Sequence, residues 1–236
     1  MWYYYGSYGI LFLCIFISLF AQIKVQSTFS KYNKIFSTKG HTGFSAARQI
    51  LDQNGLSHVR IETVAGHLTD HYDPRANVIR LSESVASSYS VAAIGVAAHE
   101  CGHAIQYAEQ YKPIVFRNAI VKSTNFCSRI SFLLILVGVL ITAMSETSGN
   151  LGTTFIYLGI LAFSAVAFFQ LVTLPVEFNA SRRALAIINH QKILTSEERA
   201  GARKVLTAAA MTYVAALVVS LLQLLRLIAI FGNRRR

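Results

Sequence analysis

The chain has 236 residues, of which 53% are hydrophobic and only 14% are charged, and its mean hydropathy is +0.44. This composition is too apolar for an ordinary soluble domain. The formal net charge of +11 is compatible with nucleic-acid binding. However, the basic residues are concentrated next to apolar runs, so we expect a membrane protein that contacts the lipid bilayer and binds no nucleic acid.

Four apolar runs are candidates for transmembrane helices, which need about 17–25 mostly apolar residues. The first covers residues 3–23, before Lys24, and lacks the basic start of a signal peptide, so we interpret it as a retained anchor. The runs at 130–145 and 151–174 are separated only by SETSGN and predict a helical hairpin. The fourth run covers 208–231.

The distribution of positive charge predicts the side of the membrane that each segment faces. Twelve of the 22 basic residues lie between Lys24 and Arg129, and six lie between Arg182 and Lys204. Cytoplasmic segments carry an excess of lysine and arginine, so we expect both stretches in the cytoplasm and the protein in the cell (inner) membrane. A fourth crossing would leave residues 234–236 outside, so the sequence leaves open whether the last run crosses fully.

The segment between the anchor and the hairpin predicts a small folded domain. A helix is expected over 43–54, with Thr42 as its N-cap and Gly55 as its stop. The alternating patterns HVRIETV and NVIRLS predict a short antiparallel sheet or hairpin. From about Ser90 the apolar residues recur at helical spacing and predict a buried helix.

Three further helices are expected toward the carboxyl end of the chain. A basic helix after Pro113 leads into the hairpin, where its charges favour lipid head groups. Pro175 stands at the expected start of another helix, VEFNASRRALAIINH. The last helix opens with TSEE at 195–198, a capping-box pattern, and runs into the fourth apolar segment.

The pentapeptide HECGH at 99–103 is the strongest indication of function. Residues four apart in a helix project roughly 40° from each other, so His99 and His103 can reach one metal ion. Glu100 then points toward the water bound to that ion, where a carboxylate can act as general base. The motif predicts a hydrolase with one zinc ion. The alternative is a buried helix whose histidines only bond to backbone.

A catalytic zinc ion of this kind needs a third protein ligand. Glu109 follows the motif too closely on the same helix, and Glu146 lies in the expected outside turn. Glu197 and Glu198 have the positions of helix-start residues. Glu177 remains, and the hairpin would return it to the same membrane side as the motif. The alternative role of Glu177 is a helix-start charge next to the preceding proline.

Three blocks in order, GHLTDHYDPRANVIRLS, GVAAHECGHAIQYAEQY and LPVEFNASRRA, resemble the YugP-type neutral zinc metallopeptidase family of prokaryotic membranes. The resemblance covers most of the chain from Gly43 to about Ala186. It implies a gluzincin arrangement, distantly similar to the HtpX and CAAX-protease group, with His99, His103 and Glu177 as zinc ligands and Glu100 as base.

Together these features predict a mainly α membrane protein with a small α+β zincin-like catalytic domain that contains a short antiparallel sheet. The expected segments are an anchor (1–24), a catalytic domain (25–129), a transmembrane hairpin (130–174), a helix with the third ligand (175–207) and a last membrane helix with a basic tail (208–236). The expected activity is that of a zinc metalloendopeptidase acting on peptides or proteins. The alternatives are an inactive scaffold with a structural zinc ion and, less favoured for lack of central acidic residues, a small transporter.

Other polar residues are also candidates for a functional role. Asp70, His71 and Asp73 could form a second metal site, although a polar turn leading into a strand explains them more simply. Arg182 and Arg183 could stabilise an oxyanion, although basic residues on a cytoplasmic helix near lipid need no such role, and Asn179 could support a ligand by hydrogen bonding. The remaining histidines are expected at the surface: His41, His58, His67 and His190. If NVIRLS forms an exposed sheet edge, a substrate peptide could pair with it.

Overall fold

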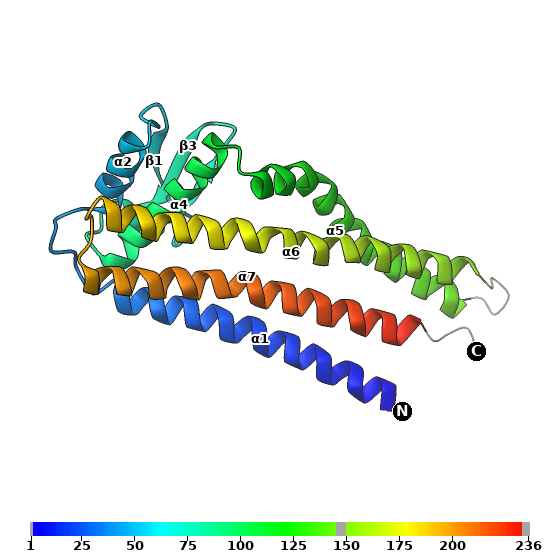
Figure 1. Cartoon of the computed structure of the whole chain (residues 1–236). Coiled ribbons are helices and arrows are strands. Elements are labelled where there is room, and N and C mark those ends of the chain that lie inside the picture. Colours follow the sequence, from blue (N-terminus) through cyan, green and yellow to red (C-terminus); the bar gives the residue numbers. More distant parts are fainter. Residues whose placement is uncertain (1, 145–149, 233–236) are drawn as a thin grey trace. The chain divides into compact units, whose positions relative to one another are not determined.

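The computed structural model describes residues 2–144 and 150–232 and is mainly helical, with one small sheet (Figure 1). The elements in chain order are α1 (Trp2–Tyr32), α2 (Gly43–Gln53), β1 (Arg60–Val64), β2 (His71–Asp73), β3 (Val78–Ser82), α3 (Glu83–Ala86), α4 (Val91–Ala108), α5 (Lys112–Met144), α6 (Leu151–His190) and α7 (Ser196–Phe231).

Backbone contacts divide the chain into two compact units. Unit 1 comprises Met1–Phe20, Phe116–Leu174 and Tyr213–Arg236, and unit 2 comprises Ala21–Val115 and Pro175–Thr212. The long helices α1, α5, α6 and α7 each contribute to both units. Helices α5 and α6 run through 129/130 and 174/175, where the sequence predicts boundaries between segments.

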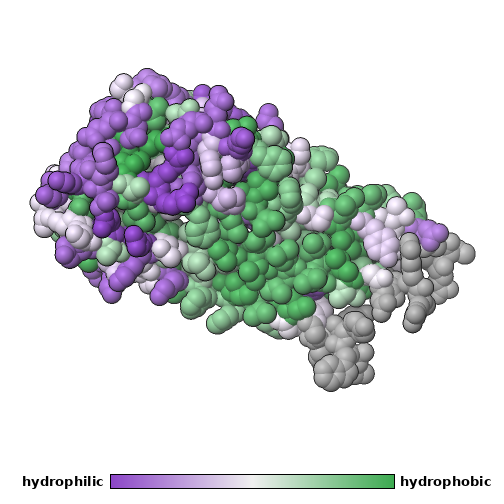
Figure 2. All heavy atoms as spheres, viewed as in Figure 1, coloured by the Kyte–Doolittle hydropathy of each residue, from purple (hydrophilic) through white to green (hydrophobic). Residues whose placement is uncertain are grey.

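The four expected apolar runs are confirmed as helices. In the described residues, four helices are long and apolar enough to cross a membrane: Ser7–Tyr32, Lys112–Met144, Leu151–His190 and Ser196–Phe231. Large apolar side chains on these helices are exposed, for example Phe12, Phe132 and Leu161. Figure 2 shows hydrophobic residues gathered along the long helices and hydrophilic residues over the part that contains the sheet. Apolar exposure on this scale is favourable when lipid, not water, surrounds the helices.

The core of unit 2 is built around α4. Alanine-rich α4 is buried along most of its length, and α2 packs against it through Ile50 and Leu51. The predicted N-cap of α2 is confirmed, because the Thr42 side chain accepts a hydrogen bond from the Ser45 amide. The Ser45 hydroxyl in turn accepts a hydrogen bond from the Thr42 amide. Gly55 follows α2 with a φ of +72°, a conformation that glycine adopts without strain.

The sheet differs from the expectation of a purely antiparallel one. Its order is β1-β3-β2, with β1 parallel to β3 and β2 antiparallel to β3. The expected exposed edge at NVIRLS is wrong, because β3 is the central strand and is paired on both sides. All of β3 except Arg80 is buried, since a central strand covered on its faces buries successive residues instead of alternating ones.

The expected helix start at Pro175 is also wrong. Pro175 lies inside α6, which continues from Leu151 to His190. A proline inside a helix removes one backbone hydrogen bond, but α6 continues because its residues beyond the proline pack in the core of unit 2, where Val176, Ala180 and Ala184 are fully buried. The predicted capping box of α7 is confirmed, since the Thr195 amide donates to the Glu198 carboxylate at 2.9 Å.

Candidate metal centre

Helix α4 presents two histidines on one face. The helix begins after Ser90, whose hydroxyl accepts a hydrogen bond from the Ala93 amide as an N-cap. His99 follows nine residues after Ser90 and His103 four residues after His99, and their rings lie edge to face with centroids 4.7 Å apart. The side chains of both histidines are largely buried, with 16% and 12% exposed. The interior position fixes both rings in one orientation.

Helix α6 brings a carboxylate to these two rings. The Glu177 Oε2 atom lies 3.4 Å from His99 Nε2 and 3.5 Å from His103 Nε2, and the Glu177 side chain is only 3% exposed. The close approach depends on Gly102, because a Cβ atom at that position would lie 2.6 Å from the Ala180 carbonyl oxygen of α6. A glycine between the histidines therefore allows the two helix backbones to meet.

Hydrogen bonds hold the far side of each imidazole ring. His99 Nδ1 lies 3.1 Å from the Ser181 hydroxyl, and His103 Nδ1 lies 3.0 Å from Gln106 Oε1. Both Nε2 atoms are thereby directed toward Glu177. Such partners of the outer ring nitrogen orient a histidine for metal binding.

A hydrogen-bond network continues outward from His103, from buried Gln106 to exposed Glu109. Gln106, which is fully buried, donates from its amide to Asn179 Oδ1 at 2.9 Å and to the Val176 carbonyl at 2.8 Å. Asn179 Oδ1 also accepts from Arg183 Nε at 2.7 Å, and Arg183 pairs with Glu109 at 2.7 Å. Through this network, the Gln106 side chain of α4 is hydrogen-bonded to two residues of α6.

Glu100 is held by strand β2. Its Oε2 atom accepts a hydrogen bond from the Tyr72 backbone amide at 3.0 Å, and the residue is 7% exposed. The negative charge of Glu100 also acts on His103. Burial alone would lower the pKa of His103, but a hydrogen bond to Glu177 and the charge of Glu100 outweigh it and raise this pKa.

The donor set suits zinc. Two imidazole nitrogens and one carboxylate oxygen are the ligands of many catalytic zinc ions, which keep a further position for water. In the described residues the ligand atoms of His99, His103 and Glu177 lie within 4.8 Å of one another, so they could hold a metal ion. Donors about 2.0–2.1 Å from one ion at tetrahedral angles would lie roughly 3.3–3.4 Å apart, close to the two distances above.

Comparisons with known proteins agree with this chemistry. Residues 7–232 match a family described as "Putative neutral zinc metallopeptidase". The chain belongs to this zinc metallopeptidase family. It is also 50% identical over 219 residues to a Bacillus subtilis (strain 168) protein named "Putative membrane protease YugP". The matched region covers 93% of each of the two chains. No solved structure matches the chain. The resemblance seen in the sequence is confirmed, and the membrane relative and the four apolar helices support a membrane protein.

Of the three other predicted site residues, Asn179 and Arg183 belong to the network that continues from His103. Asn179 contacts Gln106, as a supporting residue would. Arg183 lies beside Asn179 and Glu109, with its guanidinium 5.8 Å from the Tyr111 ring centroid. Arg182 is exposed.

The Asp70–Asp73 segment does not form a group of converging metal ligands in the described residues. Asp70 accepts hydrogen bonds from Ser82, and the ring of His71 bonds to the Thr69 carbonyl. Asp73 pairs with Arg80 at 2.6 Å. The structure agrees with the simpler interpretation, a polar segment leading into a strand: Asp70 lies just before β2, and His71 and Asp73 are the first and last residues of β2. The remaining histidines are expected at the surface. His58, His67 and His190 are exposed, and His41 is half-buried.

Sequence reasoning missed three residues that shape the centre: Gly102, Gln106 and Ser181. Their spacing holds a signal, because Gln106 is three residues after His103 and Ser181 is four after Glu177. Residues at these spacings share a helix face. The pattern indicates which polar residues can face the cluster, but not which ones do.

Proposed function

We propose that this protein is an integral membrane zinc endopeptidase that hydrolyses peptide bonds with Glu100 as general base. One zinc ion would be held by His99, His103 and Glu177 in a gluzincin-like arrangement. The observation that carries this proposal is the convergence of the three ligand atoms, from two helices, beside a carboxylate held by a strand amide.

The residues of the chain have separable roles in this proposal. When bound, zinc would lower the pKa of a water molecule and polarise the scissile carbonyl. Glu100 takes the proton that this water loses on attack and passes it to the leaving amine. The Tyr72 amide occupies Oε2 of Glu100 and so orients the carboxylate, with its other oxygen available to receive the proton.

Location follows from the charge distribution. The two basic stretches would place unit 2 in the cytoplasm, at the cell (inner) membrane. The substrates would then be peptides or proteins at the cytoplasmic face, including segments of membrane-associated proteins. The predicted division into anchor, catalytic domain, hairpin, ligand helix and last membrane helix remains part of this proposal.

The decisive experiment separates a peptidase from an inactive scaffold with a structural zinc ion. The full chain and Glu100→Gln are purified in detergent, bound zinc is measured, and cleavage of an unfolded protein is followed by mass spectrometry. We expect about one zinc ion per chain in both proteins and cleavage by the unsubstituted chain alone. Zinc in both without cleavage by either would favour the scaffold, and equal cleavage by both would exclude Glu100 as the base.

A further inference from the structure

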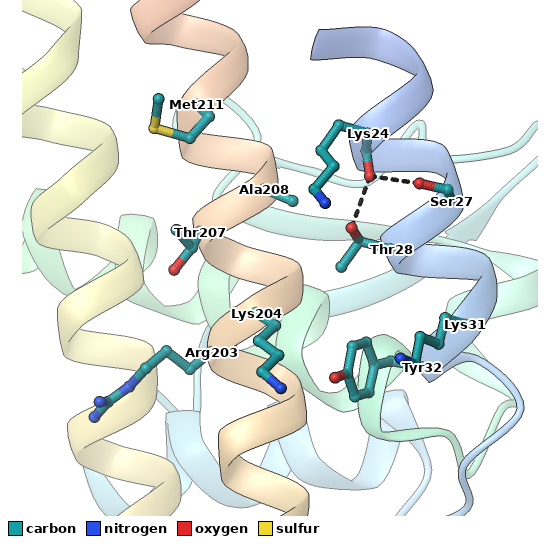
Figure 3. A pocket seen from close by; sticks show the side chains of 10 residues that line it. All are labelled: Lys24, Ser27, Thr28, Lys31, Tyr32, Arg203, Lys204, Thr207, Ala208 and Met211. Atoms are coloured by element: carbon teal, nitrogen blue, oxygen red, sulfur yellow. Dashed lines mark hydrogen bonds between the residues drawn. The ribbon is translucent and has the colours of Figure 1, made fainter. Parts of the chain in front are cut away.

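A basic groove lies between α1 and α7 in unit 2, built from residues outside the metal centre (Figure 3). Its volume is about 550 Å³, within the size range of small-ligand sites. The lining residues come from one face of each helix: Lys24, Ser27, Thr28, Lys31 and Tyr32 from α1, and Arg203, Lys204, Thr207, Ala208 and Met211 from α7.

The lining of this groove carries four positive charges and no negative charge. The cations are Lys24, Lys31, Arg203 and Lys204, and none of the ten lining residues is acidic. In the described residues, none of these four forms an ion pair with a carboxylate. Four like charges around one groove repel one another, and an anion bound between them offsets part of that repulsion.

Among the polar groups of the groove, the cations and not the hydroxyls are available to bind a ligand. The hydroxyls of Ser27 and Thr28 donate to the Lys24 carbonyl at 3.1 and 2.7 Å, so they are turned back onto their own helix (Figure 3). The buried ring of Tyr32 lies under two ammonium groups, 5.8 Å from Lys31 Nζ and 6.0 Å from Lys204 Nζ. The ring thus holds two cations at the same end of the groove.

The groove also changes from charged to apolar along its length. Lys24 is the first charged residue after the apolar run 3–23 of α1, and Ala208 and Met211 open the apolar run 208–231 of α7. In Figure 3 these residues lie at one end, whereas Lys204 and Tyr32 lie at the other. Both helices therefore pass from polar to lipid-compatible sequence at the groove, which is the depth of the head groups.

We propose that this groove binds the phosphate head group of an anionic membrane lipid. A phosphodiester carries the negative charge that the four cations attract, and its acyl chains continue along the apolar end of the same two helices. Basic pockets between membrane helices on the cytoplasmic side bind such head groups. Free phosphate has the same charge chemistry but nothing to place against Ala208 and Met211.

The test compares lipid retention by the full chain and two variants in neutral detergent. Each protein is mixed with equal amounts of phosphatidylglycerol and phosphatidylcholine, passed through gel filtration, and its bound lipid is quantified by mass spectrometry. The groove variant changes Lys24, Lys31, Arg203 and Lys204 to Gln. The matched control changes four other exposed basic residues of unit 2 to Gln: Lys34, Lys39, Arg75 and Lys192.

We expect the unsubstituted chain and the control to retain phosphatidylglycerol in preference to phosphatidylcholine. The groove variant should retain at least roughly tenfold less phosphatidylglycerol than the unsubstituted chain. Equal loss in both variants would show that only net charge matters and would overturn the proposal, as would retention by the groove variant. Thr207→Glu adds one negative charge to the same groove and should lower retention several-fold. If the fourfold variant fails to fold, this single change decides the matter.

A second arm distinguishes lipid from free phosphate. Retention of phosphatidylglycerol is repeated with inorganic phosphate in excess and with sodium chloride at the same ionic strength. We expect both salts to lower retention to the same degree, because they screen charge alike. Displacement by phosphate well beyond that of chloride would identify free phosphate as the ligand and overturn the lipid proposal.

Discussion

Two groups of histidine and acidic residues occur in unit 2, and their side chains are arranged differently. The His–Glu cluster, His99, His103 and Glu177, directs its ligand atoms at one point from two helices. The Asp–His segment, Asp70, His71 and Asp73, has similar residue types within four consecutive positions. Yet each of these three side chains bonds to a backbone or side-chain group close by.

The difference shows that proximity in sequence is a poor guide to a metal site. The short acidic side chains of the Asp–His segment find hydrogen-bond donors on the neighbouring strand β3 and are satisfied by them. Imidazoles on a helix cannot reach their own backbone in the same way, so they face whatever the neighbouring helix presents. Here that neighbour presents Glu177, at 3.4 and 3.5 Å from the two rings.

The largest expected effect comes from removing one carboxylate in each group. Glu177→Gln and Asp73→Asn make the same chemical change, from carboxylate to amide. We expect Glu177→Gln to lower zinc affinity by more than the roughly 10–100-fold typical of supporting residues, because it removes a direct ligand. Asp73→Asn should leave zinc affinity unchanged. The measurement is competition for zinc with a chromophoric chelator, using purified full-length protein.

The same two variants also show which results would contradict the different roles given to the two groups. A similar loss of zinc in both variants would mean that the Asp–His segment contributes to metal binding or to the fold of the cluster. Circular dichroism of each variant separates these two explanations. Unchanged zinc affinity in Glu177→Gln would remove Glu177 from the ligand set.

Much of the candidate site could be predicted because helix geometry is local. Spacing alone placed His99 and His103 on one face, and elimination among the few glutamates pointed to Glu177. The supporting contacts of Gln106 and Ser181 could not be predicted, because they depend on how α4 packs against α6. That packing rests on Gly102, whose missing side chain carries no chemical signal in a sequence.

The fold was less predictable where distant segments pair. The caps of α2 and α7 involve residues three apart and were read correctly from Thr42 and from TSEE. The sheet was not, since the pairing of β1 with β3 brings together residues separated by the whole of β2. Pro175 misled because its cost to a helix is local, whereas the burial of Val176 and Ala180 that outweighs it is tertiary.

A second, smaller effect should follow from closing the gap between α4 and α6. In Gly102→Ala the new Cβ would meet the Ala180 carbonyl at 2.6 Å, so one helix must shift. Overpacking of this kind costs about 1–3 kcal/mol. We expect a lower melting temperature and weaker zinc binding, because the shift moves Glu177 from the histidines.

The control for this effect lies on the same helix. Gly95→Ala brings its Cβ to 3.3 Å from the Ala202 side chain, a contact that small adjustments can relieve. Both substitutions gain about 1 kcal/mol of helix propensity, so the difference between them isolates the clash. Equal zinc affinity in Gly102→Ala and Gly95→Ala would contradict the role given to Gly102.

The smallest effect concerns the Asp–His segment alone and depends on pH. A hydrogen bond from Arg80 lowers the pKa of Asp73 below its ordinary value of 3.8. The group is therefore more readily ionised in the folded than in the unfolded chain, and its contribution to stability is present above pH 3.8 and lost as the pH falls through the lower folded value. Asp73→Asn keeps an oxygen for the Arg75 and Ala76 amides but removes the charge.

Hydrogen exchange measures this contribution where it acts. At pH 6 we expect faster amide exchange over β2 and β3 in Asp73→Asn than in the unsubstituted chain, with no difference in α2. The difference should persist just below pH 3.8 and shrink as the pH falls further, through the lower pKa of folded Asp73, because only there does Asp73 lose its charge in the unsubstituted chain. A difference that persists below the folded pKa would mean that the shape of the Asp73 side chain, and not its charge, holds β2 to β3.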